Sequence, residues 1–432
     1  MTATETVSPP PLALTPTGDR PGRFGRVQLV AVELTVIVVA AAVFTGRPVV
    51  IAVSAVAALL LLAVTFGRTR RRWLYEAVAA RRRLRRRRRA AAQALRRAEA
   101  AATVPDTRPG AVAGPGPELA ALMPGLAIRA VTDRDTAIGV GQDELGWFAA
   151  VAIAPWAGLS GERAATPRLD RLARLLVEES VPVSVLQLAT HRVAAPSAGL
   201  DARSEAAASY RELVGDAGGD AAAEVWLAVR LTPADAAYAA AHRGGGLAGV
   251  DRALAATLAR VGAVLTSAGV PHRVLDAPGL RQALATASGL QRLAGSGTAL
   301  TQPVAGTLPG AAAVAEQWAY WQAAGQLHAC FAIQDWPAQP GPALLAELAA
   351  IPAATAVDTA LVLRRPERST GGLAVRGLLR VVAAPDLLVP AIGQLLETAG
   401  RLGVRLTRLD GEHGAGVYAT APTAATLGSA SW

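Results

Sequence analysis

Two uninterrupted apolar runs near the beginning of the chain dominate its hydrophobic pattern. They cover residues 27–44 and 48–66 and are separated by a three-residue turn at 45–47. A helix that crosses the hydrocarbon core of a bilayer needs about 20 apolar residues, and it satisfies its backbone hydrogen bonds internally. Pro48 suits the first position of a helix, where no N–H partner is needed. The pattern therefore predicts a transmembrane hairpin of two helices.

A dense block of arginines follows the second apolar run directly. Residues 68–97 hold fourteen arginines and one acidic residue, Glu76, whereas the rest of the chain sums to a net charge of −3. Basic segments next to membrane helices stay in the cytoplasm. We therefore expect a multi-pass protein of the cell (inner) membrane with both termini cytoplasmic. The alternative, a cleaved signal peptide at 27–44, would force the arginine block across the membrane.

The segment 67–103 is expected to be a long basic helix that continues the second membrane helix into the cytoplasm. Beyond Gly67 it lacks Gly and Pro and is rich in Arg, Ala, Leu and Glu, which favour helices. Its larger apolar residues are too few to form a stripe that joins a core. Besides setting topology, the arginines are expected to contact anionic lipid headgroups, at about 1 kcal/mol per basic residue. The residues assigned to this role are Arg70, Arg71, Arg72, Arg81, Arg82, Arg83, Arg85 and Arg86.

Glu33 is the one ionisable residue inside an apolar run. It lies about 9 Å along the helix from the start of the run. A charge at this depth has a cost, and such residues usually face protein rather than lipid. Two interpretations stay open, namely contact with another transmembrane helix and tolerated placement near the membrane interface.

The remaining segments divide into tails, a linker and a domain. Prolines without periodicity predict a disordered cytoplasmic tail over 1–26. Pro and Gly predict a linker over 104–125. A cytoplasmic mixed α/β domain is expected over 126–422, followed by a C-terminal tail over 423–432.

Within this domain the same order of strand and helix patterns occurs twice. The first half predicts strands at 138–140 and 147–153, a helix at 168–179, strands at 183–193 and 224–231, a helix at 250–267 and a strand at 272–275. The second half predicts a strand at 328–333, a helix at 343–350, strands at 356–363 and 373–382, a helix at 387–402 and a strand at 404–409. Each half follows the βαββαβ order of ferredoxin-like units. We infer a duplication, which unmatched strand orders in the two halves would refute.

The composition excludes several reaction types. All 43 basic residues are arginine, whereas a Walker A loop and Schiff-base chemistry both need a lysine. The single cysteine, Cys330, excludes an internal disulfide and a thiolate zinc cluster. We expect it to be a buried small apolar residue. The arginine block has no aromatic platform beside it, so we expect no nucleic-acid partner.

Several short patterns remain as weak candidates for chemistry. Asp133 and Asp135 form a D-x-D pattern of the kind that holds a metal and a sugar diphosphate in many glycosyltransferases, although a surface loop is favoured. The glycines at 244–246 precede a helix and suit a phosphate, but a flexible connection is favoured. The histidines are His191, His242, His272, His328 and His413, and they show no metal-ligand spacing.

No serine elbow of the G-x-S-x-G type occurs either. We therefore predict a protein that is not an enzyme and that has no cofactor and no metal. The alternative is a membrane-anchored glycosyltransferase-like enzyme with Asp133 and Asp135 as metal candidates.

The order of these segments and several short sequence motifs resemble EccE, the membrane component of actinobacterial type VII (ESX-like) secretion systems. The resemblance covers residues 27 to about 285 and includes no catalytic signature. The segments that carry it are Val32–Leu34, the turn Gly46–Pro48, Trp73, 141–148 (GQDELGWF), 224–232 (EVWLAVRLT) and 242–246 (HRGGG).

The resemblance implies a non-catalytic structural component that stabilises a membrane assembly for protein export. Its implied partners are homologues of EccB, EccC and EccD, of which EccC is the ATPase. It also implies a soluble domain similar in architecture to glycosyltransferase-like α/β folds without an evident active site.

Overall fold

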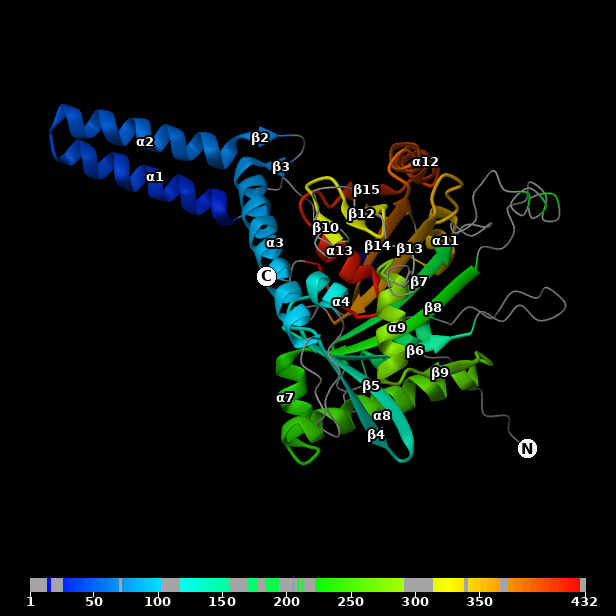
Figure 1. Ribbon diagram of the computed structural model, residues 1–432. Coiled ribbons are helices and arrows are strands. Elements are labelled where there is room, and N and C mark those ends of the chain that lie inside the picture. The colour runs from blue at the N-terminus through cyan, green and yellow to red at the C-terminus, as the bar shows by residue number, and fades with distance from the viewer. Residues whose placement is uncertain are drawn as a thin grey trace, which may run out of the picture. The chain divides into compact units, whose positions relative to one another are not determined.

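The computed structural model of the chain describes most of the expected elements (Figure 1). The described residues are 14–16, 26–69, 72–102, 117–154, 169–177, 183–193, 205, 209, 212, 222–290, 314–337, 341–365 and 372–427. They divide into two compact units, a helical unit over Asp19–Arg87 and a sheet domain formed by Met1–Gly18 and Arg88–Ser431.

Two apolar helices, α1 (Arg26–Phe44) and α2 (Pro48–Phe66), run side by side in the helical unit (Figure 1). Gly46 adopts a φ of +64° in the turn between them, a conformation that glycine reaches without strain. Helix α2 is long and apolar enough to span a membrane, whereas the apolar part of α1, Gln28–Phe44, is shorter.

The expected continuous basic helix is interrupted after α2. Gly67 adopts an extended conformation and ends α2. A two-stranded ladder of β2 (Arg68–Thr69) and β3 (Arg72–Trp73) follows before α3 (Leu74–Ala102) begins. The prediction of a helix from residue 67 was therefore wrong for its first turns, because the extended backbone at Gly67 redirects the chain.

The sheet domain contains one large sheet of thirteen strands. Its strands follow the order β10-β11-β12-β14-β13-β7-β8-β6-β5-β4, with β15 paired to β12, β9 paired to β6 and β1 paired to β14. All pairings are antiparallel except that of β1 with β14. The sheet of this domain is therefore almost entirely antiparallel.

The strands and helices of the sheet domain have the following bounds. The strands are β1 (Leu14–Pro16), β4 (Ala127–Asp133), β5 (Thr136–Asp143), β6 (Gly146–Ile153), β7 (Val185–Val193), β8 (Ala222–Leu231), β9 (His272–Val274), β10 (Val314–Glu316), β11 (Trp321–Ala323), β12 (Gln326–Asp335), β13 (Ala356–Arg364), β14 (Leu373–Ala383) and β15 (Arg405–Arg408). The helices are α4 (Pro117–Leu122), α5 (Leu169–Leu175), α7 (Pro233–Ala241), α8 (Gly246–Ser267), α9 (Ala277–Ala287), α11 (Pro342–Leu348), α12 (Leu388–Arg401) and α13 (His413–Thr420).

The two halves of the sheet have the same strand order, as the duplication requires. In the first half the order is β9-β6-β8-β7, and in the second it is β15-β12-β14-β13. Both orders follow the split βαββαβ pattern. The halves join through β7 and β13, whose nine residue pairs are centred on Ala189 and Ala360. The centre of this pairing is therefore the point about which equivalent positions of the two halves can be compared.

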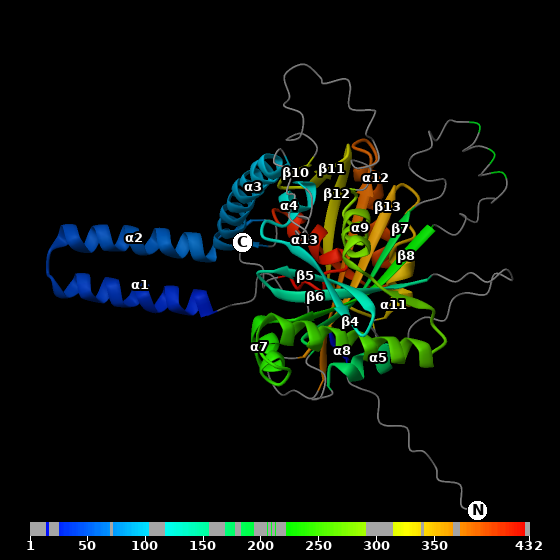
Figure 2. The ribbon, with the colours of Figure 1, turned by 60° about the horizontal axis from the view of Figure 1, so that its bottom comes forward.

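Alternation along the strands separates two faces of the sheet. On one face, apolar residues of both halves pack with α5, α8, α11 and α12 into a single core that includes Val151, Leu227, Phe331 and Leu379. On the other face lie α9 and α13 (Figure 2). Their C-terminal ends bind strand residues, since Ala287 of α9 accepts a hydrogen bond from Arg380, and Ala419 of α13 accepts one from Gln187.

Both expected tails and the expected linker contain ordered structure. Leu14–Pro16, placed in the N-terminal tail, forms β1 beside Leu373–Val375 of β14. Pro117–Leu122, placed in the linker, forms α4. Thr423 to Ala425, placed in the C-terminal tail, are buried, and Ala424 N–H donates to Gln187 Oε1. The expected tails differ from the structure because β1 and residues 423–425 bond to distant strands, which a local pattern does not indicate.

A buried ion pair fixes the C-terminal segment to the first half. Arg230 donates from Nη1 and Nη2 to the two carboxylate oxygens of Asp143 at 2.6 and 2.8 Å, and from Nε to the Thr423 carbonyl at 3.0 Å. Tyr418 donates to Asp143 at 2.5 Å. Burial and the Asp143 charge raise the pKa of Tyr418 well above its ordinary value, so its hydroxyl stays protonated.

We expect Asp143→Asn to lower the free energy of unfolding by about 3–5 kcal/mol, because it leaves the buried Arg230 without its counter-charge. Urea unfolding of the full chain measures the loss. The matched control is Asp335→Asn, since the Asp335–Arg405 ion pair lies at the surface and is worth about 0–1 kcal/mol. Equal losses in the two variants would contradict the assignment.

Candidate ligand cavity

A row of ionisable side chains, referred to below as the charged row, crosses five neighbouring strands on the face that carries α9. The register places Glu224 opposite His191, His191 opposite Asp358, and Asp358 opposite Arg380. Arg380 in turn lies opposite Cys330 of β12. Directly opposed residues in a sheet have Cβ atoms about 5 Å apart. The row therefore brings together side chains from β8, β7, β13, β14 and β12.

Asp358 contacts both His191 and Arg380 in this row. Its Oδ1 lies 2.8 Å from His191 Nδ1, and its Oδ2 lies 2.6 Å from Arg380 Nη2. Asp358 and Arg380 are almost fully buried. Arg380 also donates to the Ala287 carbonyl at the end of α9. This helix end and the carboxylate hold the guanidinium in place.

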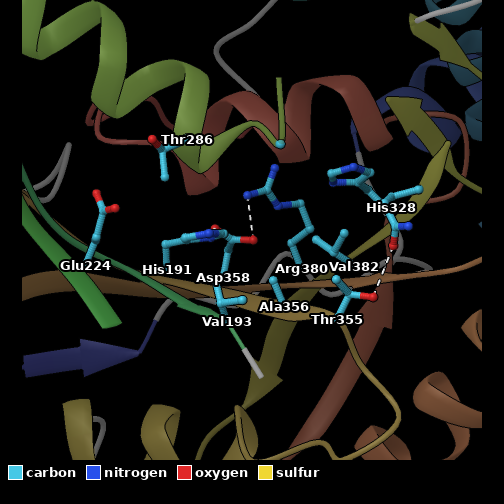
Figure 3. Close-up of a pocket in the computed structure, with 12 residues that line it drawn as sticks. His191, Val193, Glu224, Thr286, His328, Thr355, Ala356, Asp358, Arg380 and Val382 are labelled. Atoms are coloured by element: carbon cyan, nitrogen blue, oxygen red, sulfur yellow. Dashed lines mark hydrogen bonds and ion pairs between the residues drawn. The ribbon is translucent and has the colours of Figure 1, made fainter. Parts of the chain in front are cut away.

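A cavity of about 190 Å³ lies beside this row (Figure 3). Figure 3 shows Arg380 and Asp358 between His191 and His328, with Thr286 of α9 above and Thr355 at the lower edge. Thr355 Oγ1 donates to Gln326 Oε1 at 3.1 Å. The lining residues are His191, Val193, Glu224, Thr286, Gly289, Gln326, His328, Thr355, Ala356, Asp358, Arg380 and Val382.

The equivalent position in the first half is filled by the chain itself. Gln187 lies two residues before Ala189, as Asp358 lies two residues before Ala360, so the two occupy equivalent positions about the centre of the β7–β13 pairing. The Gln187 amide donates to the Ala419 carbonyl at 2.8 Å and accepts from Ala424 N–H at 2.5 Å. A neutral, fully bonded side chain in one half thus corresponds to a charged side chain beside a cavity in the other.

The D-x-D pattern lies away from this cavity. Asp133 and Asp135 flank the turn between β4 and β5, in which Arg134 and Asp135 have positive φ. Two positive φ values are typical of a tight type I′ hairpin turn. Asp135 is exposed. Among the described residues, no group of three or more His, Cys, Asp or Glu side chains is placed to hold a metal ion. The D-x-D pattern therefore lies at a hairpin turn.

Cys330 is fully buried, as predicted, under α13. Its backbone N–H donates to His413 Nδ1 at 3.1 Å. Burial raises the pKa of the Cys330 thiol to about 12, so it is protonated at neutral pH. Burial lowers the pKa of His413. The Cys330 thiol also lies 3.4 Å from the His413 carbonyl oxygen, so the two residues are in contact in the interior of the domain.

The remaining sequence candidates are dispersed. The glycines at 244–246 all have positive φ and form the turn between α7 and α8, where Arg252 donates to the Arg243 carbonyl. His242 packs against Tyr238, and His272 lies on β9. His191 and His328 are the two histidines that line the cavity. Arg70 and Arg71 lie outside the described residues, as does the environment of the Arg72 side chain.

The sequence contained a partial signal for this cavity. Asp358 and Arg380 each interrupt an otherwise apolar strand, which is unusual unless the charges are paired. Their partnership depends on the register of β13 with β14, which the sequence pattern does not determine. The role of His191 and Glu224 depends further on the joining of the two halves.

Comparison with known families places part of the chain. Residues 220–333, from β8 to β12, match the family model described as "Putative type VII ESX secretion system translocon, EccE". This segment includes the cavity residues Glu224, Thr286 and His328 and ends before Asp358. No curated protein matches the chain. The chain therefore carries an EccE segment, and its resemblance to EccE is confirmed over residues 220–333.

Proposed function

We propose that the chain is a non-catalytic structural component of a type VII protein secretion complex, which it stabilises through a transmembrane hairpin and its cytoplasmic sheet domain. The observation that carries this proposal is the EccE match at residues 220–333, downstream of an apolar helix long enough to span a membrane. EccB, EccC and EccD homologues are the proposed partners.

The outward surface of α1 and α2 supports their placement in lipid. Most exposed large hydrophobic side chains of the described residues lie on these two helices. An apolar surface of this extent is unfavourable in water and suits a bilayer. Small and hydroxyl side chains are buried instead, including Ala31, Thr35, Ala58 and Thr65. Such residues are typical of interfaces between membrane helices, where they allow close approach.

The pairing of β1 supports an even number of membrane crossings. Leu14–Pro16 precedes α1 in the chain but pairs with β14 of the sheet domain. Residues on both sides of the hairpin therefore belong to one folded unit. A folded unit is not split by a bilayer, which supports the proposal that α1 and α2 cross it together. The proposed orientation has both termini on the same side, and the positive-inside bias of the α3 arginines favours the cytoplasm as that side.

Glu33 is the proposed contact to a partner helix. Its side chain is exposed on α1, and it lies off the positions that α1 buries, which include Gln28, Ala31 and Thr35. A carboxylate that faces away from α2 has a cost in lipid unless it meets a polar group of another helix.

The arginines of α3 are the proposed contact to anionic lipid headgroups. Arg81, Arg82, Arg85 and Arg86 are exposed, and Arg83 is half-buried. Ala80 and Leu84 are buried, so the helix has an apolar side that its sequence did not indicate. These exposed arginines are accessible to a charged surface.

The experiment that tests the proposed function is purification of the full chain from its native membrane with crosslinking. We expect EccB, EccC and EccD homologues to be recovered with it. We expect Glu33→Leu to lower their recovery at least severalfold, because the partner helix loses its polar contact. The matched control is Val36→Leu, an exposed apolar position of α1. Recovery of the wild-type chain alone would refute the proposed complex, and unchanged recovery with Glu33→Leu would refute the helix contact.

The topology is tested by cysteine labelling, since Cys330 is buried and unreactive. We expect Thr45→Cys, in the exposed turn between α1 and α2, to react with a membrane-impermeant maleimide added outside intact cells. Glu144→Cys, exposed in the β5–β6 turn, should react only after the cells are opened. Labelling of both, or of neither, in intact cells would contradict the hairpin.

Replacing Arg81, Arg82, Arg85 and Arg86 with glutamine is expected to weaken binding of the full chain's α3 region to anionic lipid, because each exposed arginine contributes about 1 kcal/mol. The measurement is crosslinking of the nanodisc-embedded chain to anionic and to neutral photoactivatable lipids. Headgroup contact predicts that anionic lipid is preferred by the wild type and that salt lowers this preference. If neither salt nor the substitutions change the preference for anionic lipid, the proposed contact between the α3 arginines and lipid headgroups is wrong.

A further inference from the structure

We propose that the cavity between α9 and the charged row binds a small anion carrying a single carboxylate or phosphate group, with Arg380 as its principal ligand. The cavity is formed by residues of both halves, namely Glu224 and His191 from the first and His328, Asp358 and Arg380 from the second. The proposal is independent of the secretion assignment, because it rests on the chemistry of these side chains.

The first support is the bonding state of Arg380. Its side chain is fully buried and lines the cavity. Nη2 is engaged by Asp358 and the Ala287 carbonyl, whereas Nε and Nη1 have no hydrogen-bond partner among the described residues. Buried charged donors are rarely left unsatisfied, because each lost hydrogen bond carries a desolvation cost. An oxygen anion in the cavity would accept from these donors.

The second support is the shared use of the Asp358 carboxylate. Among the described residues, Asp358 is the carboxylate that contacts Arg380, and it also contacts His191. Its oxygens are therefore divided between a guanidinium and an imidazole. A second anion beside Arg380 would supply acceptors to the guanidinium donors that Asp358 does not reach.

The size and mouth of the cavity restrict the ligand. A volume of about 190 Å³ exceeds the roughly 30 Å³ that one water occupies in the liquid and suits a small organic or inorganic anion. Glu224 lines the cavity and is exposed to solvent. A carboxylate at this position repels polyanions and favours a ligand with one acidic group, with hydroxyl or ammonium groups toward the mouth.

The comparison between halves gives a third support. In the first half, backbone groups of Ala419 and Ala424 occupy both hydrogen-bonding ends of Gln187. The fold thus positions a polar partner above this strand position. In the second half the corresponding residue is the charged Asp358, beside Arg380 and a cavity. Equivalent positions therefore differ between the halves. Gln187 is covered by the chain in the first half, and Asp358 lines a cavity in the second.

The test is titration of the full chain in a neutral detergent with inorganic phosphate and, separately, with formate and acetate, at constant ionic strength. Calorimetry measures the dissociation constant, and thermal unfolding measures the stabilisation that binding to the folded state produces. We expect saturable binding of at least one probe at a single site. We expect Arg380→Lys to weaken this binding at least tenfold, because lysine keeps the charge but loses the planar set of donors.

Two further variants keep the result interpretable if Arg380→Lys folds poorly. Glu224→Gln, at an exposed position, is expected to tighten anion binding about twofold to fivefold by removing a like charge. Arg405→Gln, which removes an exposed arginine of β15, is expected to leave binding unchanged. This variant controls for the loss of one positive charge. The exposed arginines of α3 are present in every variant, so any anion binding by them is the same throughout.

Several outcomes would overturn the proposal. Absence of saturable binding by the wild-type chain would mean that water alone satisfies Arg380. Equal affinities of the wild type and a folded Arg380→Lys variant would place the anion elsewhere, as would equal affinities of the wild type and Glu224→Gln. Recovery of partner proteins from the membrane is measured separately, so failure of anion binding and failure of the secretion assignment are distinguishable.

Discussion

The pairing of β7 with β13 is the interaction on which the sheet domain depends. Each half alone would end in a long apolar strand with unpaired backbone groups, which is a template for aggregation. The nine residue pairs from Val185 to Val193 with Ala356 to Arg364 remove both edges at once. They also align the two helical layers, so that a single hydrophobic core extends across both halves. The cavity exists only because this pairing sets His191 opposite Asp358.

Duplication has left the two copies with different chemistry at equivalent positions. In the first half, the pair of Arg230 with Asp143 anchors the C-terminal segment, and Gln187 is enclosed by it. In the second half, Asp358 and Arg380 carry buried charge beside a cavity. The same strand order thus surrounds a bonded glutamine in one half and a charged cavity in the other. Under the proposed function and the proposed anion site, the domain would combine a structural role with a site for a small molecule.

The sequence was informative where a pattern is local and uninformative where pairing is distant. Helical and strand periodicity located the twelve elements of the repeated units, because each depends on its own residues. Helices α9 and α13 were missed, although α9 has buried residues at helical spacing, including Leu280, Ala283, Leu284 and Ala287. Helix α13 is buried at nearly every position, so it has no polar side that would reveal a helical period. The prediction of a continuous helix from residue 67 was wrong because Gly67 is extended and ends α2. The cavity was not predicted, because Asp358 and Arg380 meet only through strand register. Residues 423–425 were assigned to a tail, since the groups that bury them lie on β7 and β8.

The parallel pairing of β1 with β14 also constrains the order in which the chain folds. Leu14–Pro16 leaves the ribosome long before its partner Leu373–Val375, because more than 350 residues separate them. The two apolar helices that follow β1 are synthesised long before that partner exists. Contacts of such high sequence separation form late, because loop closure must be completed first. We therefore expect β1 to pair with β14 only after both halves of the sheet are joined.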